Sequence, residues 1–168
     1  AVQVANQSVQ VGREDELGRL SRSLPLFLAE QLWLMAKVPS SVALPVADAG
    51  GWVVPGVPWA ESRLADLLND AERQRLRIVT GLLVPEGNSR KVTLYVYDAA
   101  QRTRTGECTV TGEEGKMGPA LLSALQQLGP LLGVEGPLQP AVGNEVFWDR
   151  YATGQAQLAA LVVAHAGA

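Results

Sequence analysis

The chain has 168 residues, of which 47% are hydrophobic and 18% charged, and its formal net charge at pH 7 is −3. These values are typical of one globular domain with its own core, and they exclude a disordered chain. The acidic balance gives no long-range attraction for nucleic acid or anionic membranes. The sequence contains no apolar run of about 18 residues, the length of a membrane-spanning helix, so we expect no membrane insertion.

The first part of the chain predicts a strand followed by a helix. It begins AVQVANQ, without methionine and without a basic segment followed by an apolar one, so we expect a shortened or processed form of a longer product. Residues 2–11 alternate between apolar and polar, which predicts a strand, and residues 12–23 form a charged loop or a loose helical turn. The next helix begins at Ser23 or Leu24, with Pro25 in its first turn and Pro39 after its end. Its apolar side has helical spacing and consists of Leu24, Phe27, Leu28, Gln31, Leu32 and Met35.

The middle of the chain predicts a second strand, a shaped loop and a second helix. Residues 40–48, SSVALPVAD, form a short apolar run typical of a strand covered on both faces. The glycines and prolines of GGWVVPGVP then indicate a loop. Pro58 starts the second helix, whose apolar face consists of Ala60, Leu64, Leu67, Leu68 and Ala71.

Three consecutive strands with two tight turns follow between residues 75 and 112. The turns are PEGNSR and DAAQR, and the last strand, TRTGECTVT, is rich in threonine, which predicts an edge strand or one with a solvated face. In the first strand Leu76, Ile78, Leu82 and Val84 share one face with Thr80 between them. In the second strand Val92, Leu94 and Val96 alternate with Thr93, Tyr95 and Tyr97.

A leucine-rich helix over residues 118–133 completes the predicted domain. We expect a mixed α/β (α+β) domain at 1–133, a Pro/Gly-rich linker at 134–143 and a C-terminal helix at 144–168. The element order β-α-β-α-β-β-β-α implies a mixed sheet of about five strands with helices packed on it. The apolar face of the last helix should pack back on the domain, form a homodimer, or continue into helical repeats.

The sequence lacks the usual signatures of catalysis and of metal binding. His165 is the one histidine, which excludes a Ser-His-Asp or Cys-His arrangement and a histidine-rich metal site. Cys108 is the one cysteine, and the acidic clusters at 14–16 and 113–114 have no metal-ligand spacing. The sequence also contains no phosphate-binding, dinucleotide-binding or hydrolase motif. We therefore expect no enzyme, no metal and no cofactor.

Aromatic and basic residues give the candidate contact surface. Trp52 and Trp59 flank the loop VVPGVP, and tryptophans beside such loops occur at partner-binding surfaces as well as in cores. Arg102 and Arg104 lie in the predicted edge strand, beside Tyr95 and Tyr97 of its neighbour. These six residues are our candidate partner-binding residues.

The order of elements resembles the amino-terminal α/β domain of TolB, the FlgO-type and LpoB-type envelope proteins, and the related domain that precedes tetratricopeptide repeats in bacteria. The resemblance covers residues 2–133 and includes the helix LPLFLAEQLWLMAKVPSSVALPV, the strand RIVTGLLV, the segment KVTLYVYDAAQRTRTGE and the helix ALLSALQQLGPLL. NEVFWDRYATGQAQL is similar to the start of the following repeat region. The insertion ADAGGWVVPGVPW departs from the family pattern.

The resemblance implies a non-catalytic module that docks a protein partner, and it favours the periplasm or cell envelope over the cytoplasm. We expect the partner to bind the Trp52–Trp59 loop and to pair with the edge strand near Arg104. One alternative is a small-ligand sensor or enzyme whose pocket lies between the sheet and the 48–59 loop and uses Tyr95, Tyr97 or Arg104. A second alternative is single-stranded nucleic-acid binding, against which the acidic charge argues.

Overall fold

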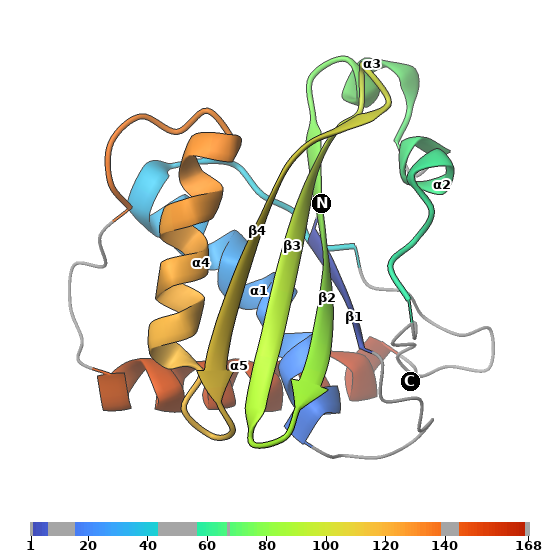
Figure 1. The fold of residues 1–168 in the computed structure, drawn as a ribbon. Coiled ribbons are helices and arrows are strands. Elements are labelled where there is room, and N and C mark those ends of the chain that lie inside the picture. Colours follow the sequence, from blue (N-terminus) through green and yellow to red (C-terminus); the bar gives the residue numbers. More distant parts are fainter. Residues whose placement is uncertain (1, 7–15, 44–56, 67, 139–144, 167–168) are drawn as a thin grey trace.

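The described part of the chain forms one four-stranded sheet with helices packed on it (Figure 1). The computed structural model describes residues 2–6, 16–43, 57–66, 68–138 and 145–166. Strand order is β1-β2-β3-β4, in which β2, β3 and β4 are antiparallel and β1 is parallel to β2, so the class is α+β. In chain order the elements are β1 (Val2–Asn6), α1 (Glu16–Ala36), α2 (Glu61–Asp66), α3 (Asp70–Arg73), β2 (Arg77–Glu86), β3 (Ser89–Asp98), β4 (Thr103–Glu113), α4 (Gly118–Leu131) and α5 (Glu145–Ala166).

The predicted sheet of about five strands, in the order β-α-β-α-β-β-β-α, is wrong, because the described residues contain four strands. The expected second strand, at 40–48, is not among the four described strands. Residues 40–43 contain only an isolated bridge at Val42, and 44–48 lie outside the described residues. Pro39 precedes this run and Pro45 lies within it, and a proline has no amide hydrogen to give to a ladder. Within the described residues there is therefore one parallel strand pair, β1 with β2, where the sequence predicted two parallel units.

Helix α1 begins earlier than the proline pattern predicts. Its first residue is Glu16, so Pro25 lies inside the helix and not in the first turn. A proline there removes the hydrogen bond to the carbonyl of residue 21. The hydroxyls of Ser21 and Ser23 donate to the carbonyls of Leu17 and Leu20, at 2.7 and 3.1 Å, a local pattern common at helix bends.

The single helix predicted from Pro58 is also wrong, because two short helices, α2 and α3, occupy this region. The second one has its own start signal. Asn69 Oδ1 accepts from the Glu72 amide, and the Glu72 carboxylate accepts from the Asn69 amide, both at 3.0 Å. This reciprocal capping box starts a new helix at Asp70, within the run whose apolar spacing predicted one continuous helix.

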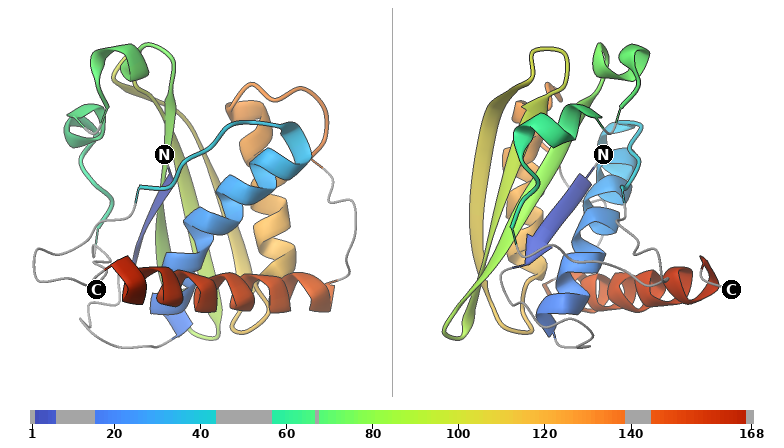
Figure 2. Two further views of the ribbon diagram at one scale, coloured as in Figure 1. Left: turned by 180° about the vertical axis from the view of Figure 1, so that it is seen from behind. Right: turned by 90° about the vertical axis from the view of Figure 1, so that its right-hand side faces the viewer.

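The main core lies between one face of the sheet and three helices, α1, α4 and α5 (Figure 2). We call this face of the sheet the helix face, and the opposite one the outer face. Each large apolar side chain that becomes fully buried stabilises the fold by about 1.5–3 kcal/mol before entropy is counted. The helix face contributes Val79, Leu83, Val92, Leu94, Val96, Cys108 and Val110, and the helices contribute Leu24, Phe27, Leu28, Leu32, Leu121, Leu125, Leu128 and Trp148.

Helix α5 packs back on the domain, across α1 and α4 (Figure 2). Trp148 is 4% exposed, and its ring meets that of Phe27 edge-on at 6.1 Å between centroids. The carboxylate of Glu30 in α1 accepts from the Tyr151 hydroxyl and from Gln155 Nε2. Helix α5 therefore packs back on the domain and contributes Trp148 to the main core, which is one of the three arrangements expected from the sequence.

A close backbone approach joins α4 and α5. Asp149 Oδ1 accepts from the Gly118 amide at 2.6 Å, which satisfies one of the free donors at the start of α4. A Cβ at residue 118 would lie 2.7 Å from the Asp149 nitrogen and from Trp148 Cβ. Only glycine fits this contact without displacing a backbone.

We expect Gly118→Ala to lower the free energy of unfolding by about 1–3 kcal/mol, because the added methyl group separates α4 from α5. Gly154→Ala is the matched control, since a Cβ at that helical position meets nothing within 4 Å. The control should be neutral or gain about 0.5–1 kcal/mol from helix propensity. Urea unfolding of both variants measures the difference, and equal effects would contradict this account of the contact.

Candidate functional site

Strand β4 forms one edge of the sheet, as its threonine-rich sequence predicts. Buried Cys108 and Val110 point to the helix face, whereas Glu107, Thr109 and Thr111 are exposed on the outer face. Among the described residues no other strand pairs with the second side of β4. The strand is therefore held through one row of hydrogen bonds and one row of apolar side chains.

The turn between β2 and β3 determines which amides of β4 face outward. The turn consists of Gly87 and Asn88, and Gly87 has φ +60°, as expected at the first central position of a type II′ turn. In such a turn the flanking pair, Glu86 and Ser89, is hydrogen-bonded. Bonded and non-bonded pairs then alternate, and the even-numbered residues of β3, from 90 to 96, bond to residues 106, 108, 110 and 112 of β4. The amide and carbonyl groups of residues 107, 109 and 111 therefore point to the free edge.

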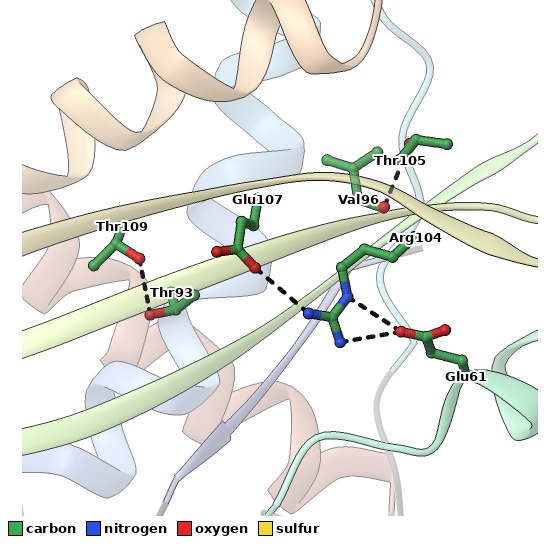
Figure 3. Close-up of polar contacts among 7 residues, drawn as sticks. All are labelled: Glu61, Thr93, Val96, Arg104, Thr105, Glu107 and Thr109. Atoms are coloured by element: carbon green, nitrogen blue, oxygen red, sulfur yellow. Dashed lines mark hydrogen bonds and ion pairs between the residues drawn. The ribbon is translucent and has the colours of Figure 1, made fainter.

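A β-bulge interrupts the ladder near the start of β4. Val96 pairs with Gly106 and Tyr97 pairs with Arg104, so Thr105 is the extra residue. Its hydroxyl donates to the Val96 carbonyl at 3.4 Å (Figure 3). The regular part of the free edge thus extends from Gly106 to Gly112, a stretch without proline or lysine.

The outer face of the sheet is covered in part by α2. Leu64 and Leu68 pack on Ile78, Tyr97 and Ala99 to form a small second core, with Trp59 at its margin. A pocket of about 100 Å³ remains between α2 and the sheet. Its walls are Pro58, Trp59, Glu61, Leu64, Thr80, Tyr95, Tyr97 and Arg104.

Arg104, which lines this pocket, connects β4 to α2 (Figure 3). Its Nε and one terminal nitrogen bond to Glu61 Oε1 at 3.1 and 3.0 Å, and the other terminal nitrogen lies 3.4 Å from Glu107 Oε2. The guanidinium carbon also lies 4.3 Å from the ring centroid of Tyr95. Since Arg104 is 45% exposed, each ion pair adds at most about 1 kcal/mol, and their combined effect is to fix the geometry.

The structure brings together four of the six candidate residues, since Trp59, Tyr95, Tyr97 and Arg104 all line the pocket. Arg102 lies outside it, exposed in the β3–β4 turn with φ 55°. Trp52 lies outside the described residues, as does most of the 48–59 loop. The described end of that loop, at Pro58 and Trp59, forms one wall of the pocket.

Thr80 and Glu61 belong to the pocket but were not candidates from sequence. Thr80 is 3% exposed between apolar neighbours, and its position inside an apolar strand was the one available signal. Tyr97 is 2% exposed, and burial raises the pKa of its hydroxyl, with Glu61, Asp66 and Asp98 adding to the rise and Arg102 opposing it. The Tyr97 hydroxyl thus stays protonated at neutral pH and can donate a hydrogen bond.

A larger hollow of about 840 Å³ lies between the end of α1, α3 and the start of β2, and sequence reasoning did not anticipate it. Two of its three charged residues, Glu72 and Arg77, make contacts that hold the fold together, and Arg75 is the third. Glu72 closes the capping box of α3, and Arg77 donates to the Leu131 carbonyl at 3.1 Å. We assign this hollow no function.

The acidic pair at 113–114 makes structural contacts, and the described residues offer no metal site. Within these residues no group of three or more His, Cys, Asp or Glu side chains could hold a metal ion. Of the acidic pair at 113–114, Glu113 bonds to Lys116 at 3.0 Å and Glu114 pairs with Arg90. None of the described helices is long and apolar enough to cross a membrane.

No model of a known protein family matches the chain, and no curated protein sequence matches it. The resemblance to the TolB amino-terminal domain therefore stays a prediction.

We expect the Cys108 thiol to resist an external thiol reagent at pH 8 and to react once urea unfolds the chain. Burial beneath α4, with a smaller effect of Glu107, raises its pKa from 9.0 to about 11. The unfolded chain loses this proton first, so the contribution of Cys108 to stability is present below pH 9 and is lost as the pH rises towards 11. Cys108→Ala should remove that part of the pH dependence. Rapid labelling of the folded protein would contradict the burial.

Proposed function

We propose that this domain is a non-catalytic protein-interaction module that binds an extended segment of a partner along the free edge of β4. The observation that supports the proposal is the regular stretch Gly106–Gly112 with outward backbone groups at 107, 109 and 111. An added strand would receive main-chain hydrogen bonds there, and alternate side chains would supply specificity. The partner segment should be extended, free of proline at the pairing positions, and about five residues long.

Most of the charged side chains on β4 already have partners within the domain. Arg104 pairs with Glu61 and Glu107, and Glu113 pairs with Lys116. Affinity should therefore come from the backbone groups of the edge more than from ion pairs, and it should depend weakly on salt. The proposal agrees with what the TolB-like resemblance implies, namely a docking module of the bacterial cell envelope. A homodimer through the C-terminal helix stays a separate prediction.

Nucleic-acid binding has less support from the same geometry. Stacking of bases requires free aromatic faces, and the guanidinium of Arg104 covers one face of Tyr95 while Tyr97 is buried. Arg104 is also neutralised by two carboxylates. The net charge of −3 acts in the same direction.

In the free protein we expect the amide hydrogens of Glu107, Thr109 and Thr111 to exchange with solvent much faster than those of Cys108 and Val110. The outward amides have no strand to pair with among the described residues, whereas their neighbours bond to β3. Residue-resolved hydrogen exchange by NMR measures this alternation. Uniform protection along β4 would mean that the edge is already covered.

We expect Thr109→Pro to abolish, or weaken by at least about tenfold, the binding of peptides selected on the wild-type protein from a random library. Proline removes the outward amide hydrogen at residue 109 but leaves the bonds of β4 to β3 intact, as in natural edge strands. Thr109→Val is the matched control. It keeps the backbone donor and loses only the hydroxyl contact to Thr93 Oγ1, 3.1 Å away, so binding should be retained.

Far-ultraviolet circular dichroism checks that both variants of residue 109 fold. Peptides that bind wild-type protein and Thr109→Pro equally would contradict edge pairing, and so would a library that yields no binding peptide. Titration of a selected peptide should also slow hydrogen exchange at residues 107, 109 and 111.

A further inference from the structure

The pocket beneath α2 is lined by two hydroxyl-bearing side chains, Thr80 and Tyr97. Thr80 is 3% exposed and Tyr97 is 2% exposed, and both line the pocket. Among the described residues neither hydroxyl has a hydrogen-bond partner. Neither oxygen is one of the fully buried, unpartnered side-chain atoms of the described residues, so both are accessible from the pocket, and a group that enters it can bond to them in place of water.

The remaining walls determine what charge a ligand can carry. Arg104 in the pocket wall forms ion pairs with Glu61 and Glu107, which compensate its charge. Other charges near the Tyr97 hydroxyl are Asp66, Asp98 and Arg102. An anion would have to compete with Glu61 for Arg104 in an acidic environment. A cation would have to compete with Arg104 for Glu61 and Glu107, so neither sign of charge meets a free counter-charge here.

The size and the aromatic walls limit the shape of the ligand. A volume of about 100 Å³ exceeds that of a single water molecule, for which about 10–15 Å³ suffices, and suits a group the size of one six-membered ring. Trp59 and Tyr95 offer ring faces or edges against which a flat group can pack.

We propose that the pocket between α2 and the sheet binds a small, uncharged, ring-containing molecule that carries an amide or hydroxyl group. The ring packs between Trp59 and Tyr95, and the polar group reaches the hydroxyls of Thr80 and Tyr97. Each hydroxyl both donates and accepts, so an amide can satisfy them together. The inference is independent of strand pairing at β4, because it uses the outer face of the sheet and not the backbone of its edge.

Three probes with the same ring and different charge test this proposal: benzamide, benzoate and benzylammonium. Each is titrated into the isotopically labelled protein, and the shifts of the backbone amides of Thr80, Tyr95 and Tyr97 and of the Trp59 indole N–H are followed by NMR. We expect benzamide to shift these signals and the two charged probes to bind at least about tenfold more weakly, a difference of about 1.4 kcal/mol. Stronger binding of either charged probe would overturn the charge argument.

Two variants separate the pocket from its surroundings. Thr80→Val keeps the shape of the side chain but removes the hydroxyl, and we expect benzamide affinity to fall about three- to tenfold. Thr93→Val is the matched control. It removes a hydroxyl from the same outer face of the sheet, in the neighbouring strand β3 and outside the pocket, so it should leave the affinity unchanged. Tyr97→Phe should act like Thr80→Val.

The proposal is overturned if none of the three probes shifts the pocket signals, or if Thr80→Val and Thr93→Val behave alike. Shifts that appear only at residues outside the pocket would also overturn it. The peptide experiments on Thr109 do not bear on these outcomes, so each proposal can fail alone.

Discussion

Helix α1 is buried on most of its surface, and the other elements are arranged around it. Leu24, Phe27 and Leu28 are fully buried, and the helix contacts β1, β2, α4 and α5. Burial on this scale offsets the proline inside the helix, because the packing of several large apolar side chains outweighs about 3 kcal/mol for an interrupted helix bond. It also explains why α5 returns to the domain, since Phe27 needs Trp148 and Tyr151 to complete its surroundings.

The two faces of the sheet have different roles as a result. Three helices cover the helix face, and α4 approaches β4 closely because Gly106 and Gly112 present no Cβ to Leu131 and Met117. This approach fixes the edge strand from behind and leaves its outer row of backbone groups without a neighbour among the described strands. Among the described residues, the short helix α2 covers part of the outer face, and the pocket lies between this helix and the sheet. Both proposed sites thus lie away from the main core, one at the edge of β4 and one on the outer face of the sheet.

Arg104 lines the pocket and precedes the regular free edge of β4 by two residues, so it lies between the two proposed sites. Its guanidinium lies over the ring of Tyr95. It also bonds to Glu61 of α2 (Figure 3). Because its partners are all within the domain, Arg104 acts as a structural connection in the free protein. A partner that pairs with β4 would lie beside it, and a ligand under α2 would lie behind it. The same side chain would then be in contact with either one.

The local elements follow from the sequence by itself. Alternation, the Gly87–Asn88 turn and the threonine-rich last strand determine the three antiparallel strands, and leucine spacing determines α4. The sequence also placed four of the eventual pocket residues on a short list, because aromatic and basic side chains on a strand face are informative locally. The tertiary structure decided the number of strands, the start of α1, the division of α2 from α3, and the enclosure of Thr80. Those features depend on which surfaces meet and how much apolar area they bury, and that energy comes from residues far apart in the chain.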